Sequence, residues 1–319
     1  MKNQKHIIVT GGAGFIGAHL VERLLADGKS VVVIDDLSTG NRDNLRAVAM
    51  KKNFRFIQSK ISNCTELAGL AADAEIIYHL AATVGVELVV KSALHVLEAS
   101  FNETQILLRA AEKNSTPLLL TSTSEVYGKS AKPEFSEDDD LLIGPPGHSR
   151  WSYACSKLTD EFLALAYARE KNLPVVIARL FNTVGPRQTG RYGMVLPRFI
   201  AAAKYNEPLK VFGDGAQSRC FCLVHDVVES LVRLQKCDAA RGEIFNIGGT
   251  EEISMLDLAK LVVETLGSKS TIELIPYDQA YAPGFDDMRR RKPLVEKLER
   301  FVQYKPPTTL REIIRLTAG

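Results

Sequence analysis

The chain has 319 residues, of which 45% are hydrophobic and 24% charged, and its formal net charge is +2. This composition is ordinary for a globular protein with a large core, and a chain without a basic run is not expected to bind nucleic acid. No apolar stretch approaches the roughly 18 residues that span a membrane, and the N-terminus leads directly into a predicted strand without a signal peptide, so we expect a cytoplasmic protein that binds no membrane.

The first forty residues predict a dinucleotide-binding site. An apolar run at 6–9 leads into a glycine-rich turn, a helical pattern covers about Phe15 to Ala26, and a second apolar run ends at Asp35. Gly11 permits a tight turn, Gly14 lets the backbone approach a pyrophosphate, and Gly17 lets the helix pack close to the strand. The free N–H groups at the start of the helix point at the phosphates.

Asp35 indicates which dinucleotide binds. It lies 18 residues beyond Gly17, near the spacing of about 20 expected for the acid that accepts hydrogen bonds from the ribose hydroxyls. A carboxylate there would repel a 2′-phosphate, so the sequence favours NAD over NADP.

Strand and helix patterns alternate through the first half of the chain, which predicts a parallel sheet covered on both faces. We expect further strands at 54–57, 75–80, 117–122 and 173–179, and long helices at about 93–113 and 153–171. The loop at 135–147, with its acidic run at 137–140, is interpreted as a solvated surface turn.

After residue 180 the alternation breaks down. We expect helices near 194–204 and 225–236, strands at 209–212 and 244–248, and a helix capped by Ser254 that runs to about Leu266. The predicted fold is α/β: a Rossmann-type doubly wound parallel sheet with a smaller, interleaved C-terminal substrate domain. The NAD-binding domain is expected at 1–180 with the return of 221–250, and the substrate domain at 181–220 and 251–319.

The cysteines are scattered and odd in number. They predict reduced thiols and no metal site, because no ligand spacing for a metal is present. The five positions are Cys64, Cys155, Cys220, Cys222 and Cys237.

Tyr153 and Lys157 form the predicted catalytic pair. They stand at i and i+4 and therefore on one face of a helix. A phenol with a pKa near 10 is a poor base at pH 7, and a nearby ammonium lowers that pKa. Tyr153 can then take a proton from a sugar hydroxyl while hydride passes to NAD, and Lys157 can also hold the nicotinamide ribose. A hydroxyl at the end of the 117–122 strand would share the substrate oxygen, from Ser122, Thr123 or Ser124.

Together these motifs resemble the extended short-chain dehydrogenase/reductases, the nucleotide-sugar epimerase/dehydratase family. The likeness covers nearly the whole chain, including TGGAGFIG at 10–17, YHLAA at 78–82, TSTSEVYG at 121–128, YACSK at 153–157 and RLFNTVGPR at 179–187. The resemblance implies a tightly bound NAD that is recycled within one turnover. It also implies a nucleotide-sugar substrate, UDP-linked above all, and a homodimer formed through the two long helices.

The resemblance extends to the residues that contact the cofactor. Lys60 stands where the family usually has an acid that contacts adenine, so that contact is expected from the backbone of Ile61 instead. The expected cofactor-binding residues are Gly11, Gly14, Phe15, Ile16, Gly17, Asp35, Asp36, Ile61, Leu80, Ala81, Ala82, Asn102, Ser122, Tyr153 and Lys157.

For the substrate, the resemblance implies contacts of Asn182 and the 195–199 region with the nucleotide diphosphate. Two phosphates need cations, and Arg187 and Arg219 are the candidates. The full expected substrate-binding set is Val84, Glu87, Ser124, Asn182, Arg187, Val195, Val211, Phe212, Arg219 and Arg291, with Val211 and Phe212 lining the nucleobase pocket.

The reaction that follows oxidation at C4 depends on Glu125 and Arg291. Simple 4-epimerases usually carry a small or apolar residue at the position of Glu125, whereas Ser124-Glu125 and Arg291-Lys292-Pro293 are similar to UDP-glucuronate decarboxylases. A β-keto acid loses CO2 readily, and the enzyme then needs a cation for the carboxylate and a proton donor at C5. Arg291 is the candidate cation, and Glu125 or Ser124 the donor.

The predicted function is therefore decarboxylation of UDP-glucuronate to a UDP-pentose, with the catalytic residues Ser124, Glu125, Tyr153, Lys157 and Arg291. A UDP-sugar 4-epimerase stays open, acting on UDP-glucose and UDP-galactose or on the corresponding uronates. It stays open because Leu88 replaces a tyrosine usual in the decarboxylases and Glu87 would repel a uronate. A non-catalytic NAD-binding scaffold or sensor is the remaining alternative.

Overall fold

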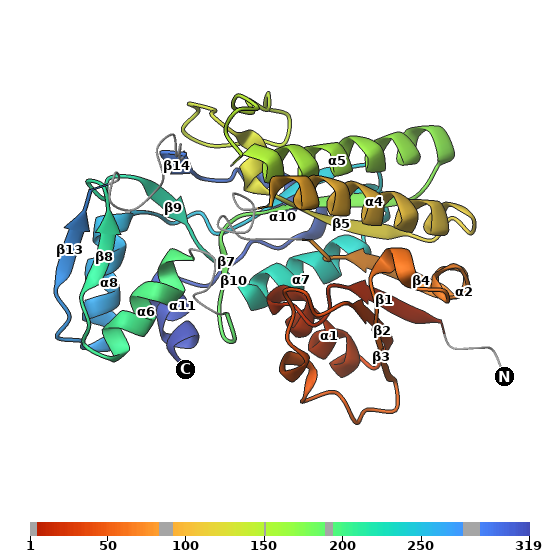
Figure 1. Cartoon of the computed structure of the whole chain (residues 1–319), viewed down its shortest axis with the longest axis horizontal. Coiled ribbons are helices and arrows are strands. Elements are labelled where there is room, and N and C mark those ends of the chain that lie inside the picture. Colours follow the sequence, from red (N-terminus) through yellow and green to blue (C-terminus); the bar gives the residue numbers. More distant parts are fainter. Residues whose placement is uncertain (1–4, 83–91, 150, 189–193, 277–287) are drawn as a thin grey trace.

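The computed structural model of the protein describes residues 5–82, 92–149, 151–188, 194–276 and 288–319 (Figure 1). Its centre is a parallel sheet of seven strands. In their order across the sheet these are β11 (Ile244–Ile247), β6 (Val175–Leu180), β5 (Leu118–Thr123), β4 (Ala74–His79), β1 (His6–Thr10), β2 (Ser30–Asp35) and β3 (Phe54–Gln58). The order reverses between β1 and β4, which is where a doubly wound sheet opens a crevice at the carboxyl ends of its strands.

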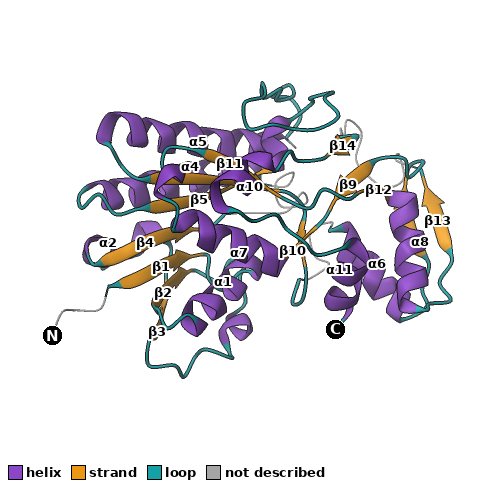
Figure 2. Cartoon of the chain, turned by 180° about the vertical axis from the view of Figure 1, so that it is seen from behind, coloured by secondary structure: helices purple, strands orange, loops and turns teal. Residues whose placement is uncertain are grey.

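The central strands are apolar along their whole length because both faces of the sheet are covered. In β1, Ile7 and Val9 belong to one core, and Ile8 between them belongs to another. The first core is closed by α1 (Phe15–Ala26), α7 (Val224–Gln235) and α10 (Glu296–Val302), and the second by α2 (Leu67–Ala72), α4 (Ala93–Glu112) and α5 (Trp151–Lys171). Figure 2 shows the same layers from behind. The Rossmann-type doubly wound fold is confirmed.

A third core forms beyond the carboxyl ends of the strands. Its helices are α6 (Val195–Lys204), α8 (Met255–Leu266) and α11 (Leu310–Ala318). The short strands of this region are β7 (Thr183–Val184) with β10 (Cys222–Leu223), β8 (Leu209–Phe212) with β13 (Ile272–Ile275), and β9 (Ser218–Cys220) between β12 (Glu252–Ser254) and β14 (Arg290–Arg291). Single-turn helices are η1 (Arg42–Leu45), η2 (Ile61–Asn63), η3 (Ser124–Tyr127) and η5 (Asp238–Ala240).

Two predictions for the second half of the chain are confirmed. Ser254 caps α8, because its Oγ accepts a hydrogen bond from the backbone N of Asp257 at 3.0 Å. The strand β11 returns to the main sheet beside β6. The division of the chain into two domains stays a prediction. The helix α10, which we expected in the substrate domain, packs on the large sheet instead of in the third core.

The 135–147 loop is not simply the solvated turn that we expected. Phe135 is 1% exposed and stacks on Tyr127, with ring centroids 4.7 Å apart. The Glu137 carboxylate, 9% exposed, accepts a hydrogen bond from the backbone N of Asn246 at 2.8 Å. Asn246 lies in β11, the edge strand of the sheet, so the loop supplies a hydrogen-bond partner on the side where the described sheet has no further strand.

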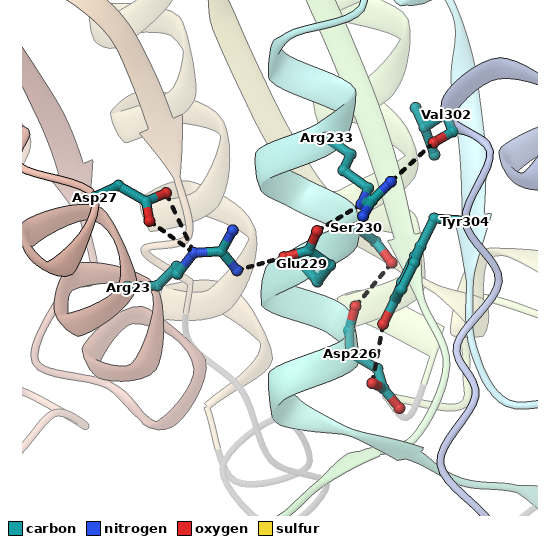
Figure 3. A network of polar contacts seen from close by, with 8 residues as sticks. All are labelled: Arg23, Asp27, Asp226, Glu229, Ser230, Arg233, Val302 and Tyr304. Atoms are coloured by element: carbon teal, nitrogen blue, oxygen red, sulfur yellow. Dashed lines mark hydrogen bonds and ion pairs between the residues drawn. The ribbon is translucent and has the colours of Figure 1, made fainter.

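A polar network joins α1, α7 and the C-terminal segment (Figure 3). Arg23 of α1 donates to Glu229 of α7, and Glu229 also accepts from Arg233 at 2.5 Å. Farther along, Tyr304 donates to Asp226 of α7 at 3.0 Å. These contacts connect the chain after α10 to α7, which covers the same face of the sheet as α1. Among the described residues, no helix has the length and apolarity needed to cross a membrane.

Candidate active site

A cavity of about 640 Å³ opens at the carboxyl ends of β1, β2, β4 and β5. Its wall combines the glycine turn, the β5–η3 junction, the start of α5 and parts of the C-terminal region. The predicted site residues that line it are Gly11, Gly14, Phe15, Ile16, Gly17, Asp35, Asp36, Ile61, Leu80, Ala81, Ala82, Ser122, Ser124, Glu125, Tyr153, Lys157, Asn182, Arg187, Val195, Val211, Phe212, Arg219 and Arg291. Segments far apart in the sequence therefore meet around one space.

The glycine turn can be built only with glycine at two positions. Gly11 has φ +70°, and a Cβ on it would lie 2.6 Å from the backbone N of Ala81. A Cβ on Gly17 would overlap the carbonyl oxygen of Gly11 and lie 2.8 Å from the Cα of Gly12. The helix α1 then begins after Gly14 without a side-chain cap, which leaves its first N–H groups directed at the cavity. This arrangement fits the pyrophosphate of a dinucleotide.

Asp35 also supports the turn itself. Its carboxylate is 8% exposed and accepts hydrogen bonds from the backbone N atoms of Ala13 at 2.9 Å and Leu37 at 2.8 Å. Burial raises the pKa of this carboxyl, and the two backbone hydrogen bonds oppose the rise. Each oxygen has one used lone pair and one remaining, so the carboxylate can still accept a ribose hydroxyl.

Lys60 lines the cavity next to Ile61. The lining residues of α4 are Ala99, Ser100 and Glu103, whereas Asn102 is exposed and is not among them. The family resemblance implied a contact of Asn102 with the cofactor, whereas the polar residues of α4 that line the cavity are Ser100 and Glu103. Ser100 was not predicted.

The Tyr153 phenol meets a hydroxyl of β5, and that hydroxyl belongs to Thr123. A side-chain hydrogen bond joins the two residues, and Thr123 Oγ1 also accepts from the backbone N of Glu125 at 3.2 Å. Ser124, which we assigned to catalysis, lines the cavity beside them and is 1% exposed. The structure therefore favours Thr123 among the three hydroxyls that the sequence left open.

The expected depression of the tyrosine's pKa is not found in the protein alone. Burial raises the pKa of Tyr153 above its ordinary value, and the Glu125 carboxylate acts in the same direction. Lys157 is 2% exposed, and its ammonium donates to Asp160 at 3.2 Å. Its charge is therefore balanced by the Asp160 carboxylate, which was not among the predicted site residues.

Ser122 lines the cavity, but its hydroxyl is hydrogen-bonded to α5. It donates to Glu161 of α5, whose carboxylate is bound by Arg179 at 2.7 Å. Arg179 in turn donates to the Tyr127 hydroxyl at 3.0 Å. All four side chains are buried, so the network fixes the β5–η3 junction against α5.

Glu125 and Arg291, the two residues expected to decide the reaction, form an ion pair across the cavity. Arg291 Nη1 donates to Glu125 Oε1 at 2.8 Å, although the two residues are 166 positions apart. Each side chain is 13% exposed. The cavity therefore contains a cation and a carboxyl group near the Tyr153–Thr123 pair, since Glu125 directly follows Ser124 in η3.

The two phosphate-binding candidates differ in their surroundings. Arg187 lines the cavity, but its guanidinium contacts Glu22 of α1 at 2.7 Å and His19 at 2.9 Å, which gives it a role in joining the 182–188 loop to α1. Arg219 is 6% exposed in β9 and lines the cavity beside Asn182. Val84 and Glu87, with Leu88, lie outside the described residues. The individual roles stay predictions.

Comparison with known proteins agrees with this arrangement. A model of the NAD dependent epimerase/dehydratase family matches residues 7–248. The chain is 39% identical over 304 residues to a UDP-N-acetyl-alpha-D-glucosaminuronate decarboxylase of Bacillus cytotoxicus, covering 95% of this chain and 93% of the relative. It is 36% identical to UDP-glucuronic acid decarboxylase 2 of Arabidopsis thaliana, covering 96% of this chain and 66% of that longer protein.

A solved structure shows the same fold. UDP-glucuronic acid 4-epimerase from Bacillus cereus, in complex with UDP-glucuronic acid and NAD, aligns with a TM-score of 0.87 at 31% identity, over 98% of both chains. The family model covers most of the chain, and the relatives extend the match to nearly all of it. The glycine turn, the Tyr153–Lys157 pair and these matches together show that the chain belongs to the NAD dependent epimerase/dehydratase family.

Proposed function

We propose that this protein decarboxylates a UDP-linked hexuronate, with UDP-glucuronate as the first candidate, and forms a UDP-pentose through a 4-keto intermediate. The observation that carries the proposal is the Arg291–Glu125 pair, 2.8 Å apart, in the cavity that also contains Tyr153 and Lys157. A guanidinium suits the planar carboxylate of a uronate, and a carboxylic acid suits proton delivery to carbon.

The first step is oxidation at C4. Bound NAD+ supplies the hydride acceptor for this step. Tyr153 takes the proton of the C4 hydroxyl, and Thr123 holds the same oxygen through the hydrogen bond that joins it to Tyr153. The product of this step is a β-keto acid, because the C6 carboxylate is attached to C5, next to the new carbonyl.

Arg291 and Glu125 act in the second step. The substrate carboxylate replaces Glu125 as the partner of Arg291. Cleavage of the C5–C6 bond releases CO2 and leaves the electron pair on C5 as an enolate. Glu125, released from Arg291 and protonated by water, donates that proton to C5, and return of the hydride to C4 then reduces the 4-keto pentose.

The remainder of the substrate is placed by the C-terminal region. Val211 and Phe212 of β8 line the cavity where we place the nucleobase, and Arg219 of β9 and Asn182 lie where we place the diphosphate. We also propose that NAD stays bound between turnovers. The glycine turn and Asp35 support this, because Ala13 of the turn belongs to the core and its backbone N donates to the buried Asp35 carboxylate.

A 4-epimerase is the second candidate. Its support is the Bacillus cereus 4-epimerase, whose structure with UDP-glucuronic acid has the same fold over 98% of this chain. Both reactions share the oxidation at C4. They differ in the fate of C6, which an epimerase retains and a decarboxylase releases.

Mass spectrometry of the reaction products tests the proposal. The purified protein is incubated separately with UDP-glucuronate, UDP-N-acetylglucosaminuronate and UDP-glucose, the second because the Bacillus cytotoxicus relative is named for it. We expect a product lighter than the substrate by one CO2 from at least one uronate and no conversion of UDP-glucose. A uronate product of unchanged mass would instead support the epimerase.

A further inference from the structure

A buried carboxylate lies behind the Tyr153–Lys157 pair, and the proposed chemistry does not use it. Asp160 follows Lys157 by three residues in α5 and is 0% exposed. Its Oδ2 accepts hydrogen bonds from Lys157 Nζ at 3.2 Å and from Ser100 Oγ of α4 at 2.7 Å. Its Oδ1 is buried and has no hydrogen-bond partner in the part of the chain that the structure describes.

A buried carboxylate lowers the stability of the fold unless it compensates another buried charge. The side chains of Lys157 and Asp160 are 3% and 0% exposed, so neither ion keeps its hydration. Removing one member of a buried pair leaves the other without compensation, which typically costs about 3–5 kcal/mol. Ser100 occupies one lone pair of Oδ2 and fixes the carboxylate from the facing helix. Asp160 therefore holds the Lys157 ammonium and is itself held by α4.

We propose that Asp160 is a positioning residue: anchored by Ser100, it holds the Lys157 ammonium and balances its charge, so that the Tyr153 phenol ionises at a higher pH than the ammonium alone would allow. The proton then leaves to water through the cavity that Tyr153 lines. This inference rests on the proposed use of Tyr153 as the base, and it adds a residue that sets the pH at which this base ionises.

The other charged groups around the pair agree with this arrangement. From β4, His79 lies near Lys157 and Asp160, and burial lowers its pKa to about 3, so it is neutral at pH 7. From η3, Glu125 faces Tyr153 and is paired with Arg291 of β14. From α4, Glu103 lines the cavity and accepts a hydrogen bond from the backbone N of Ser62 at 2.9 Å. Among the described residues, Asp160 is the carboxylate that contacts Lys157.

Spectroscopic titration of Tyr153 in the NAD+-loaded protein tests the inference without any sugar substrate. The tyrosinate absorbance of each protein is measured against pH, and the curve of the same protein with Tyr153→Phe is subtracted. Asp160→Asn keeps the shape and removes the charge, so we expect the midpoint to fall by about one pH unit. Asp138→Asn, an exposed position, is the matched control and leaves the midpoint unchanged.

An unchanged midpoint in Asp160→Asn would overturn the inference and leave Asp160 with a purely structural role. If that variant does not fold, Ser100→Ala still decides: it removes the anchor of Asp160 and keeps both charges, so we expect the midpoint of Tyr153 to shift, and an unchanged midpoint would overturn the inference. Because no substrate is present, a protein that converts no UDP-hexuronate but shows these shifts would contradict the proposed function and not the role of Asp160.

Discussion

At the scale of single residues, the Arg291–Glu125 pair connects recognition of the substrate with its conversion. Both side chains are mostly buried, at 13% exposed each, so neither ion is free to take a new partner without losing the present one. A uronate offers Arg291 another carboxylate and releases Glu125 toward C5. A neutral hexose offers no such exchange.

The pair predicts opposite effects of two substitutions on binding. In Glu125→Gln, Arg291 loses its competing partner, so the Kd for UDP-glucuronate should fall about tenfold, equivalent to about 1.4 kcal/mol, while kcat falls about 100-fold or more because C5 lacks its proton donor. In Arg291→Gln the Kd should rise. Calorimetric titration measures the Kd of each variant for UDP-glucuronate. UDP-glucose is the control ligand, and its Kd should change in neither variant. Weaker binding of UDP-glucuronate by Glu125→Gln would contradict this account.

His19 predicts a second effect, on stability. It is 5% exposed in α1, its Nε2 donates to the carbonyl of Pro186 at 3.0 Å, and its Nδ1 accepts from Arg187 at 2.9 Å. The guanidinium can only donate, so the proton of the neutral ring is assigned to Nε2. Burial is the largest cause that lowers the pKa of His19, to about 4 from 6.5.

Because the folded pKa lies below the unfolded one, the contribution of neutral His19 is fully present above pH 6.5 and is lost as the pH falls toward 4. We expect the difference in the free energy of unfolding between the unaltered protein and His19→Gln to shrink by up to about 3 kcal/mol between pH 7 and pH 4. Urea unfolding at both pH values measures it. The exposed His148→Gln should show no such change, and a constant difference for His19→Gln would be the contrary result.

At the scale of elements, the close approach of α1 to β1 depends on Gly17. We expect Gly17→Ala to destabilise the protein by about 3 kcal/mol and to weaken NAD binding, because its Cβ meets backbone atoms that cannot move aside. Gly69→Ala is the matched control, since Gly69 lies in α2 with no atom within 4 Å of a Cβ. That variant should be slightly more stable, by about 0.5–1 kcal/mol. Thermal unfolding with and without NAD measures both, and equal behaviour of the two variants would disprove the packing argument.

The same scale shows what a pattern in sequence can and cannot indicate. The apolar periodicities predicted the strands and helices of the sheet because burial on two faces leaves a continuous apolar run, as at 6–9. The 135–147 loop was misjudged because its acidic composition is that of a solvated turn, whereas the Glu137 carboxylate finds its partner 109 positions later in the chain. Local composition contains no information about such a partner.

At the scale of the whole molecule, four large apolar side chains stay exposed on α4 and α5. Leu94 is 70%, Leu97 39%, Phe101 41% and Phe162 68% exposed, and a stripe of this kind is typical of an interface between subunits. We infer from it that the protein forms a homodimer through these two helices, as the family resemblance implied.

The inferred dimer predicts a specific effect of one charge. Phe162→Asp should convert the protein to a monomer in sedimentation velocity. The two-fold symmetry of a dimer would bury the new carboxylate of both subunits in one interface. Leu274→Asp, at a position 54% exposed in β13, is the control and should leave the dimer intact. A monomeric unaltered protein, or a dimeric Phe162→Asp variant, would contradict the assignment.

The sequence predicted the chemical types present at the site better than their contacts. Tyr153 and Lys157 follow from a helical spacing and line the cavity as expected. The Arg291–Glu125 contact does not follow from any spacing, since the fold brings together residues 166 positions apart. The choice of Thr123 over Ser124 depends on where β5 ends and η3 begins, a boundary that composition does not define within one residue.

The fate of carbon 6 tests the central claim most directly. UDP-glucuronate labelled with 13C at C6 is incubated with the NAD-loaded protein and followed by 13C NMR. We predict that the carboxylate resonance is replaced by those of CO2 and bicarbonate, in proportion to the UDP-pentose formed, and that Tyr153→Phe with its NAD retained leaves the label in place. A label that stays in the carboxylate of UDP-galacturonate would contradict decarboxylation and identify the protein as a 4-epimerase.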